Sequence, residues 1–156
     1  MADLVRVGEV ESNGSASPGM QPAGVLETVL YAPDLEATEA FWRDVLGMEP
    51  FHTLAGRQIF YRCGNQVILI FNPEATVVPP KDGTLPVPPH GARGEGHVCF
   101  RASADEIAAW RSLLEAKGVM IESDFIWPAS GGRSIYFRDP AGNCLEFAEP
   151  KIWGLT

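Results

Sequence analysis

Three residues that can ligate a metal ion or move a proton interrupt otherwise apolar, strand-like stretches of this sequence: Glu27 in VLETVLYA, His97 in HVCFRA and Glu146 in NCLEFAE. A buried carboxylate is costly unless it is solvated, hydrogen-bonded to a cation or bound to a metal. For any one of the three alone, a solvated strand face or a structural hydrogen bond is the commoner explanation. The elements that carry them decide whether they act together.

The same order of elements occurs twice in the chain. A strand at 25–32 precedes a helix at 34–47 and strand-like runs near 49–53, at 57–63 and at 66–71. A second strand at 97–102 precedes a helix at 103–118, which starts with Ser103 and Glu106 at capping-box spacing, and strand-like runs at 119–127, 133–139 and 143–149. Each half therefore follows the plan strand, helix, three strands.

Individual residues repeat as well. Trp42-Arg43 in the first helix recurs as Trp110-Arg111 in the second, and IFYR with Gly64-Asn65 recurs as IYFR with Gly142-Asn143. A period of about 70 residues is typical of a duplicated supersecondary module rather than of a solenoid. When the opening strands are aligned, Glu27 falls on His97. Three ligand-type residues at related positions of a duplicated module favour a shared role.

Composition limits the classes of protein. With 46% hydrophobic and 21% charged residues, 156 residues can bury one core, in a single compact unit of two small halves. The net charge of -8 and the absence of a Lys/Arg cluster exclude a nucleic acid or an anionic membrane as partner. The sequence has no apolar run long enough to span a membrane, and its N-terminus does not resemble a signal peptide. A cytoplasmic protein is therefore expected. The three cysteines have no metal-binding or redox spacing and are expected to be reduced.

Composition also predicts the division of the chain. The stretch 11–24 is rich in Ser, Gly and Pro, and residues 1–23 are expected to form a flexible extension, within which Met20 is a possible start. The proline-rich stretch 72–96 is expected to contain neither a helix nor a central strand. A single domain at 24–150 then consists of a first module at about 24–75, a connector at 76–94 and a second module at about 95–150, followed by a tail at 151–156.

The sequence resembles the vicinal oxygen chelate superfamily of glyoxalases, bleomycin and fosfomycin resistance proteins and extradiol dioxygenases. The resemblance covers about residues 25–150, and its most specific stretches are LETVLYAPDLEATEAFWRDVLGM, GEGHVCF and YFRDPAGNCLEF. It implies an α+β fold of two βαβββ modules whose mixed, curved sheets form a cavity for a metal ion and a substrate. Relatives commonly dimerise, and some build the site from two subunits. A homodimer is therefore expected, and whether Glu27 meets His97 within one chain stays open.

Carried over position by position, Glu27, His97 and Glu146 match metal-ligand positions, and the two glutamates are also candidates for catalytic proton transfer. The implied cofactor is a divalent ion: Mn, Ni, Zn, Mg or Fe. The sequence departs from the family pattern twice. The first-strand ligand is often histidine, where this chain has Glu27. Glyoxalases of this type usually take a fourth ligand from the last strand of the first module, where every residue from 67 to 71 is apolar.

Three protein ligands with open coordination positions are typical of a catalytic metal site. We therefore expect a glyoxalase-like lyase or isomerase whose small-molecule substrate chelates the ion through neighbouring oxygens. Two alternatives remain: a metal-free drug-binding protein of the bleomycin-resistance type, and an extradiol-type dioxygenase, for which two histidines and one carboxylate are usual.

Four further side chains are candidates for the substrate pocket, where they would orient an oxyanion: Tyr31, Arg62, Trp127 and Arg138. Packing or a surface ion pair is the commoner role for each. The other two histidines, His52 and His90, are expected to be exposed.

Overall fold

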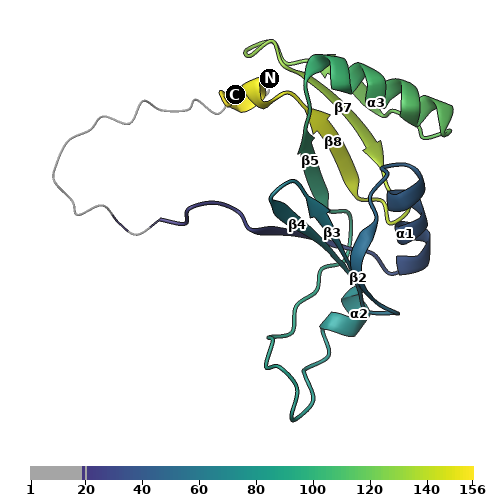
Figure 1. Ribbon diagram of the computed structural model, residues 1–156, viewed down its shortest axis with the longest axis vertical. Coiled ribbons are helices and arrows are strands. Elements are labelled where there is room, and N and C mark those ends of the chain that lie inside the picture. The colour runs from purple at the N-terminus through teal and green to yellow at the C-terminus, as the bar shows by residue number, and fades with distance from the viewer. Residues whose placement is uncertain (1–18, 20) are drawn as a thin grey trace.

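The computed structural model describes residues 19 and 21–156, which form two four-stranded mixed sheets (Figure 1). The first sheet has the order β1-β4-β3-β2, with β1 parallel to β4 and the other pairs antiparallel. Its strands are β1 (Glu27–Tyr31), β2 (Pro50–Leu54), β3 (Gln58–Cys63) and β4 (Gln66–Phe71). One helix, α1 (Leu35–Asp44), follows β1.

The second sheet repeats this arrangement in the order β5-β8-β7-β6. Its strands are β5 (His97–Arg101), β6 (Ser123–Ile126), β7 (Arg133–Arg138) and β8 (Cys144–Ala148), and α3 (Ala104–Ala116) follows β5. Again only the first and last strands pair in parallel. The prediction of two βαβββ modules in an α+β fold is confirmed.

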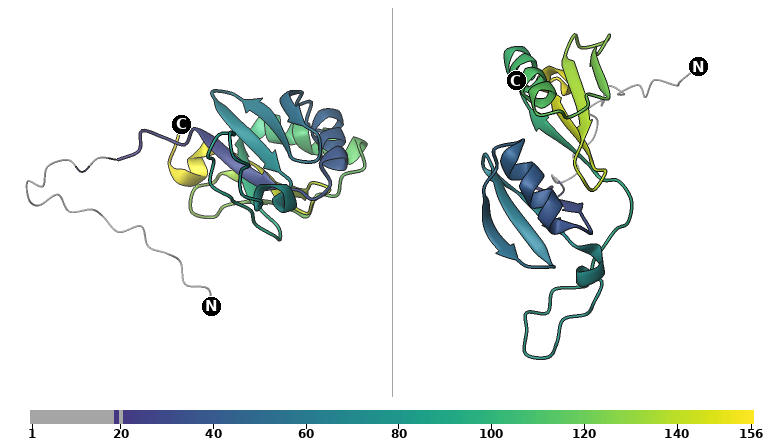
Figure 2. Two further views of the ribbon diagram at one scale, coloured as in Figure 1. Left: turned by 90° about the horizontal axis from the view of Figure 1, so that it is seen from below. Right: turned by 90° about the vertical axis from the view of Figure 1, so that its right-hand side faces the viewer.

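Both long helices begin where their capping residues predict. The Asp34 side chain accepts a hydrogen bond from the backbone N–H of Ala37 at the start of α1. At the start of α3, Ser103 and Glu106 form the predicted capping box. Figure 2 shows each helix beside the sheet of its own module.

The hydrophobic core joins the two modules. Trp42 of α1 is fully buried, stacks on Tyr61 of β3 at 5.1 Å and meets Phe100 of β5 edge-on at 6.1 Å. Leu30 and Phe137 belong to the same cluster. Because successive strand residues point to opposite faces, Glu27 and His97 lie on the sheet faces that point away from this core.

The connector contains one turn of helix, α2 (Pro73–Thr76), so the prediction that 72–96 holds no helix is wrong at this point. Pro73 is tolerated because it occupies the first turn, where its missing N–H has no partner to lose, and the Asn72 side chain caps the backbone N–H of Glu74. Beyond α2 the chain runs without helix or strand to β5.

The two ends of the chain flank the predicted domain. The predicted extension at 1–23 falls mostly on residues outside the described part of the chain. At the other end, Pro150–Trp153 forms a 3₁₀ turn. Across residues 19 and 21–156, each helix is too short or too polar to cross a bilayer.

Candidate metal centre

His97 and Glu146 meet on the outer face of the second sheet. His97 opens β5 opposite Cys144, and Glu146 lies opposite Cys99 two residues further along β8. Both side chains point to the same face, and His97 Nε2 lies 3.3 Å from Glu146 Oε2. The structure thus brings together two of the three predicted ligands.

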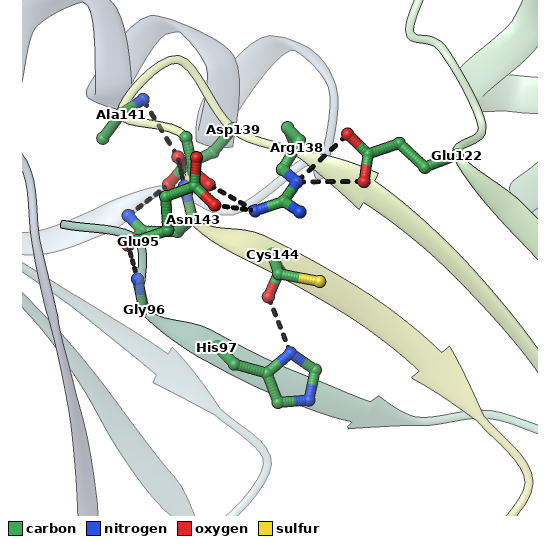
Figure 3. Close-up of polar contacts among 10 residues, drawn as sticks. Glu95, Gly96, His97, Glu122, Arg138, Asp139, Ala141, Asn143 and Cys144 are labelled. Carbon is green, nitrogen blue, oxygen red and sulfur yellow. Dashed lines mark hydrogen bonds and ion pairs between the residues drawn. The ribbon is translucent and has the colours of Figure 1, made fainter. Parts of the chain in front are cut away.

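The backbone sets the protonation of the His97 ring. His97 Nδ1 lies 3.0 Å from the carbonyl oxygen of Cys144, which can only accept, so Nδ1 carries the proton (Figure 3). In neutral imidazole the lone pair is then on Nε2, the atom that faces the Glu146 carboxylate. Two acceptors at this separation need a cation between them, either a second proton on His97 or a metal ion. A ligand histidine held by a backbone carbonyl through its other nitrogen is the usual arrangement at metal sites.

The Glu146 carboxylate is only 5% exposed, and its Oε1 atom is buried without a hydrogen-bond partner. A buried carboxylate oxygen without a partner is costly and points to a cation. The negative charge also acts on its neighbours: burial and the Glu146 carboxylate together raise the pKa of the Tyr136 hydroxyl and of the Cys99 thiol. His97 and Glu146 therefore fit a divalent ion as two of its ligands.

Glu27 lies apart from this pair. It is exposed at the start of β1. Among residues 19 and 21–156, no three His, Cys, Asp or Glu side chains come close enough together to hold a metal. The chain by itself therefore presents an incomplete ligand set.

The sheet register identifies the position of the missing fourth ligand. Glu146 pairs with Cys99, two residues after His97, and Leu69 pairs with Val29, two residues after Glu27. Leu69 is therefore the counterpart of Glu146, and its buried apolar side chain cannot ligate a metal.

A buried polar network positions His97. Asn143 accepts through Oδ1 from the backbone N–H of Gly96 (2.8 Å), next to His97 (Figure 3). Its Nδ2 donates to the Tyr31 carbonyl oxygen at 3.2 Å. A Cβ at Gly96 would lie 2.9 Å from Asn143 Oδ1, so only glycine allows this approach.

Asp139 completes the network. Its Oδ1 accepts from the backbone N–H groups of Ala141 and Asn143, and its Oδ2 accepts from Asn143 Nδ2 and, at 3.4 Å, from Trp42 Nε1. No role was predicted for Asp139 and Asn143. Their Asp-Pro-x-Gly-Asn spacing is typical of a turn held by its own side chains and is the sequence signal for this network.

The four predicted pocket residues are dispersed. Arg138 is engaged by Glu122 (3.0 Å) and Glu95 (2.8 Å), the ion-pair role considered for it. Arg62 lies over the Phe51 ring and lines a cavity of about 640 Å³ between the modules, together with Cys99. Trp127 and Tyr31 do not line that cavity.

Trp127 and Tyr31 each have a specific partner. Trp127 Nε1 donates to Ser134 Oγ at 2.8 Å. The Tyr31 hydroxyl is hydrogen-bonded to His90 Nδ1 at 2.8 Å. His90 is thus half-buried, and the expectation that it is exposed is wrong, whereas His52 is exposed as expected.

An aromatic row beside the ligand pair was not predicted. Phe125 stacks on Tyr136 at 5.9 Å, and Tyr136 lies parallel to His97 at 6.3 Å. The alternation of β6 and β7 puts these side chains on one face. The face that carries His97 and Glu146 can therefore bind a flat or apolar group.

Comparisons with known proteins agree with this architecture. A family model described as Glyoxalase/Bleomycin resistance protein/Dioxygenase superfamily matches residues 24–147. A crystal structure of lactoylglutathione lyase from Agrobacterium tumefaciens is 42% identical, with a TM-score of 0.82, over 87% of this chain and 100% of that chain.

More distant structures share the fold. A glyoxalase/bleomycin resistance protein/dioxygenase from Nocardioides is 21% identical, with a TM-score of 0.64, over 83% of this chain and 85% of that chain. A fosfomycin resistance protein from Listeria monocytogenes, complexed with Mn(II) and a dihydroxypropylphosphonic acid, is 20% identical, with a TM-score of 0.59, over 81% of this chain and 90% of that chain. Among curated protein sequences, no match was found.

Proposed function

Because the chain belongs to the glyoxalase/bleomycin resistance protein/dioxygenase superfamily, we propose that it is a metal-dependent, glyoxalase-like lyase or isomerase. Its substrate is a small oxygenated molecule that chelates a divalent ion through neighbouring oxygens. The observation that carries this proposal is the Glu146 carboxylate, whose Oε1 is buried and unpaired and whose Oε2 lies 3.3 Å from His97 Nε2. The likeness to a lactoylglutathione lyase supports the reaction class.

The proposed ligand set spans two subunits of a homodimer: His97 and Glu146 of one chain, and Glu27 of the partner subunit. Glu27 is exposed on the face of its sheet that points away from the shared core, as His97 is in the second module. The same two faces expose apolar side chains, including Val29 and Phe125, which a dimer would cover. Both observations favour completion of the site by a second copy.

The ligand set fits the ions expected from the sequence, Mn, Ni, Zn, Mg or Fe, because two carboxylates and one imidazole combine oxygen and nitrogen donors. A bound ion would polarise the two chelating oxygens of the substrate as a Lewis acid. The chain's own residues would orient the substrate and move protons. The Cys144 carbonyl accepts from Nδ1 of His97 and leaves Nε2 free to bind the ion. A glutamate carboxylate, from Glu27 or Glu146, would take a proton from a hydroxyl-bearing substrate carbon and return it to the neighbouring carbonyl carbon, while the hydroxyl proton moves to the carbonyl oxygen.

A metal-free drug-binding function is the second candidate. The row formed by Phe125, Tyr136 and His97 supports it, because parallel aromatic rings provide a surface on which a planar ligand can stack. Such a function does not require His97 and Glu146 together. A ring-cleaving dioxygenase has less support, since a glutamate occupies the place of the second histidine.

Metal analysis of the purified chain after loading with each candidate ion tests the proposal. We expect about one ion per chain for the wild type, because a dimer then has two sites. If the wild type binds no divalent metal under any loading condition, the proposed enzyme is contradicted and the drug-binding function is the candidate that stays.

Complementation tests whether the site is shared. Glu27→Gln and His97→Gln should each abolish metal binding in a homodimer. After the two variants are refolded together, about a quarter of the sites should return, because a mixed dimer contains one intact site and one doubly altered site. If each site belonged to one chain, mixing would restore none.

A further inference from the structure

The proline-rich segment forms a second cavity with the outer face of the first sheet. This loop pocket, of about 660 Å³, lies between residues 75–90 and the ends of β3 and β4. Its walls include Arg57, Phe60, Phe71, Lys81, Leu85 and His90. In Figure 1 the segment that closes it extends beyond α2, at the end of the first sheet.

Contacts with the first module hold both ends of the loop that forms this pocket. Besides its bond to the Tyr31 hydroxyl, His90 packs edge-on against Phe71 at 4.7 Å and donates its backbone N–H to the Thr76 carbonyl oxygen. At the other end, Arg57 Nη1 donates to the Ala75 carbonyl oxygen at 2.6 Å. The prolines between these anchors restrict the loop further, so little ordering is left for a ligand to impose.

The charge of the loop pocket is opposite to that of the chain. Arg57 and Lys81 line it, and none of the Asp and Glu residues that the structure describes does. Within the described part of the chain, neither cation has a carboxylate within ion-pair distance, whereas Arg138, Arg133 and Arg93 all do. In a protein with a net charge of -8, two unpaired cations beside one cavity favour an anionic ligand.

The remaining walls are apolar. Phe60 and Phe71 contact each other edge-on at 5.5 Å, and Leu85 and Val87 face them from the loop. Such walls bury the body of a ligand and leave orientation to the few polar groups. The loop pocket therefore suits an anionic group on an aromatic or aliphatic body.

The loop pocket shares a face with Glu27. Phe71 pairs with Tyr31, and Phe60 with Leu69, so all point to the side on which Glu27 lies. Tyr31 lies four positions after Glu27 in β1, a distance of about 13 Å along an extended strand. We propose that the loop pocket binds the anionic, apolar end of an elongated substrate whose oxygenated end reaches the metal centre. This inference rests on the function proposed above.

Titration of the full-length, metal-free chain with 2-naphthalenesulfonate and with its neutral sulfonamide tests the proposal. We expect the anion to bind about tenfold more tightly than the amide, because only the anion pairs with Arg57 and Lys81. Lys81→Glu should weaken binding of the anion about fivefold and leave the amide unchanged. Lys117→Glu makes the same charge change at the exposed residue that caps the C-terminal end of α3, in the other module, and should alter neither.

A second variant tests the loop anchor. Tyr31→Phe removes the hydroxyl that holds His90 and keeps the ring, so both probes should bind more weakly while the preference for the anion remains. Equal binding of anion and amide, or equal effects of Lys81→Glu and Lys117→Glu, would overturn the proposal.

The two proposals fail separately. Glu146→Gln should lose the metal and keep the naphthalenesulfonate affinity of the wild type. A chain that binds metal but does not prefer the anion contradicts the loop pocket alone. A chain that prefers the anion but takes up no metal contradicts the enzyme alone and leaves an anion-binding site.

Discussion

The turn between β3 and β4 and the turn between β7 and β8 carry the same Gly-Asn pair, yet the two asparagines have different environments. Asn65 is exposed, whereas Asn143 is fully buried and bonded to Gly96, Tyr31 and Asp139. The difference arises because Asn143 packs against the first module and donates to the Tyr31 carbonyl oxygen, whereas Asn65 lines the open cavity between the modules. Duplication supplied two equivalent positions, and docking of the modules gave one of them a structural role.

The last strands differ in the same way. Leu69 and Glu146 occupy equivalent positions, and both are buried on outer sheet faces. A leucine there contributes only packing, whereas a buried carboxylate without a hydrogen-bond partner for Oε1 is the more costly residue and supports a cation-binding role. The second module therefore provides the metal-binding half of the proposed site, and the first provides Glu27 and the loop pocket.

The largest expected effect concerns this pair of strands. Glu146→Gln keeps the shape and removes the charge, so metal affinity should fall by at least about 100-fold. A chelator should lower the Tm of the wild type, because the ion stabilises only the folded state, and should leave that of the variant unchanged. As a control, Leu69→Met should bind metal as the wild type does. Wild-type affinity in Glu146→Gln would place the ion elsewhere.

The two asparagines provide the next comparison. Asn143→Ala should lower the free energy of unfolding by about 3 kcal/mol, because it leaves the Gly96 N–H and the Tyr31 carbonyl without their partner. Asn65→Ala should change it by less than about 0.5 kcal/mol, as exposed substitutions usually do. Urea denaturation measures both. Equal losses would mean that the buried network does not hold the modules together.

Substitution of the two repeated tryptophans, Trp42 and Trp110, should give a smaller difference in stability than substitution of the two asparagines. Trp42→Phe removes the indole N–H from Asp139 and leaves a gap in the shared core, which should cost about 2 kcal/mol. Trp110 is half-buried and stacks on Phe147 at 4.5 Å, a contact that phenylalanine can keep, so Trp110→Phe should cost less than about 1 kcal/mol. Thermal unfolding of the two variants gives the comparison. A larger loss for Trp110→Phe would reverse this assignment of the core.

The smallest effect concerns the arginines that follow these tryptophans. Arg43 pairs with Asp44 on an exposed surface, whereas Arg111 and Arg133 both pair with Asp124. Hydrogen bonds from Arg133 first, and then from Arg111, outweigh burial and lower the pKa of Asp124. A carboxyl whose pKa is lower in the folded state adds stability above its unfolded pKa of about 3.8 and loses it as the pH falls through the folded pKa.

Asp124→Asn should therefore cost about 1 kcal/mol at pH 7, since the arginines are partly exposed. The difference from the wild type should shrink below pH 3.8. Asp44→Asn should leave the stability unchanged at either pH. Urea denaturation at pH 7 and pH 3 measures this, and a constant difference would show that Asp124 does not titrate in this way.

Local patterns predicted the modules and the orientation of their side chains. Strand alternation put Glu27, His97 and Glu146 on the faces where they lie, and Ser103 and Glu106 marked the start of α3. The apolar run from 67 to 71 showed that a fourth ligand is missing before the register identified Leu69. These inferences succeed because each depends on neighbours within a few residues along the chain.

Contacts between distant segments had to come from the tertiary structure. A strand pattern shows which side chains share a face, but it does not show which other element covers that face. For this reason the sequence could not separate Asn143 from Asn65, predict the bond between Tyr31 and His90, or show that Glu27 lies apart from His97. The sequence by itself determined two modules and three candidate ligands. The helix-covered faces of the two sheets pack into one core, and this packing turns the faces that carry Glu27, His97 and Glu146 outward. As a result, only His97 and Glu146 meet within one chain.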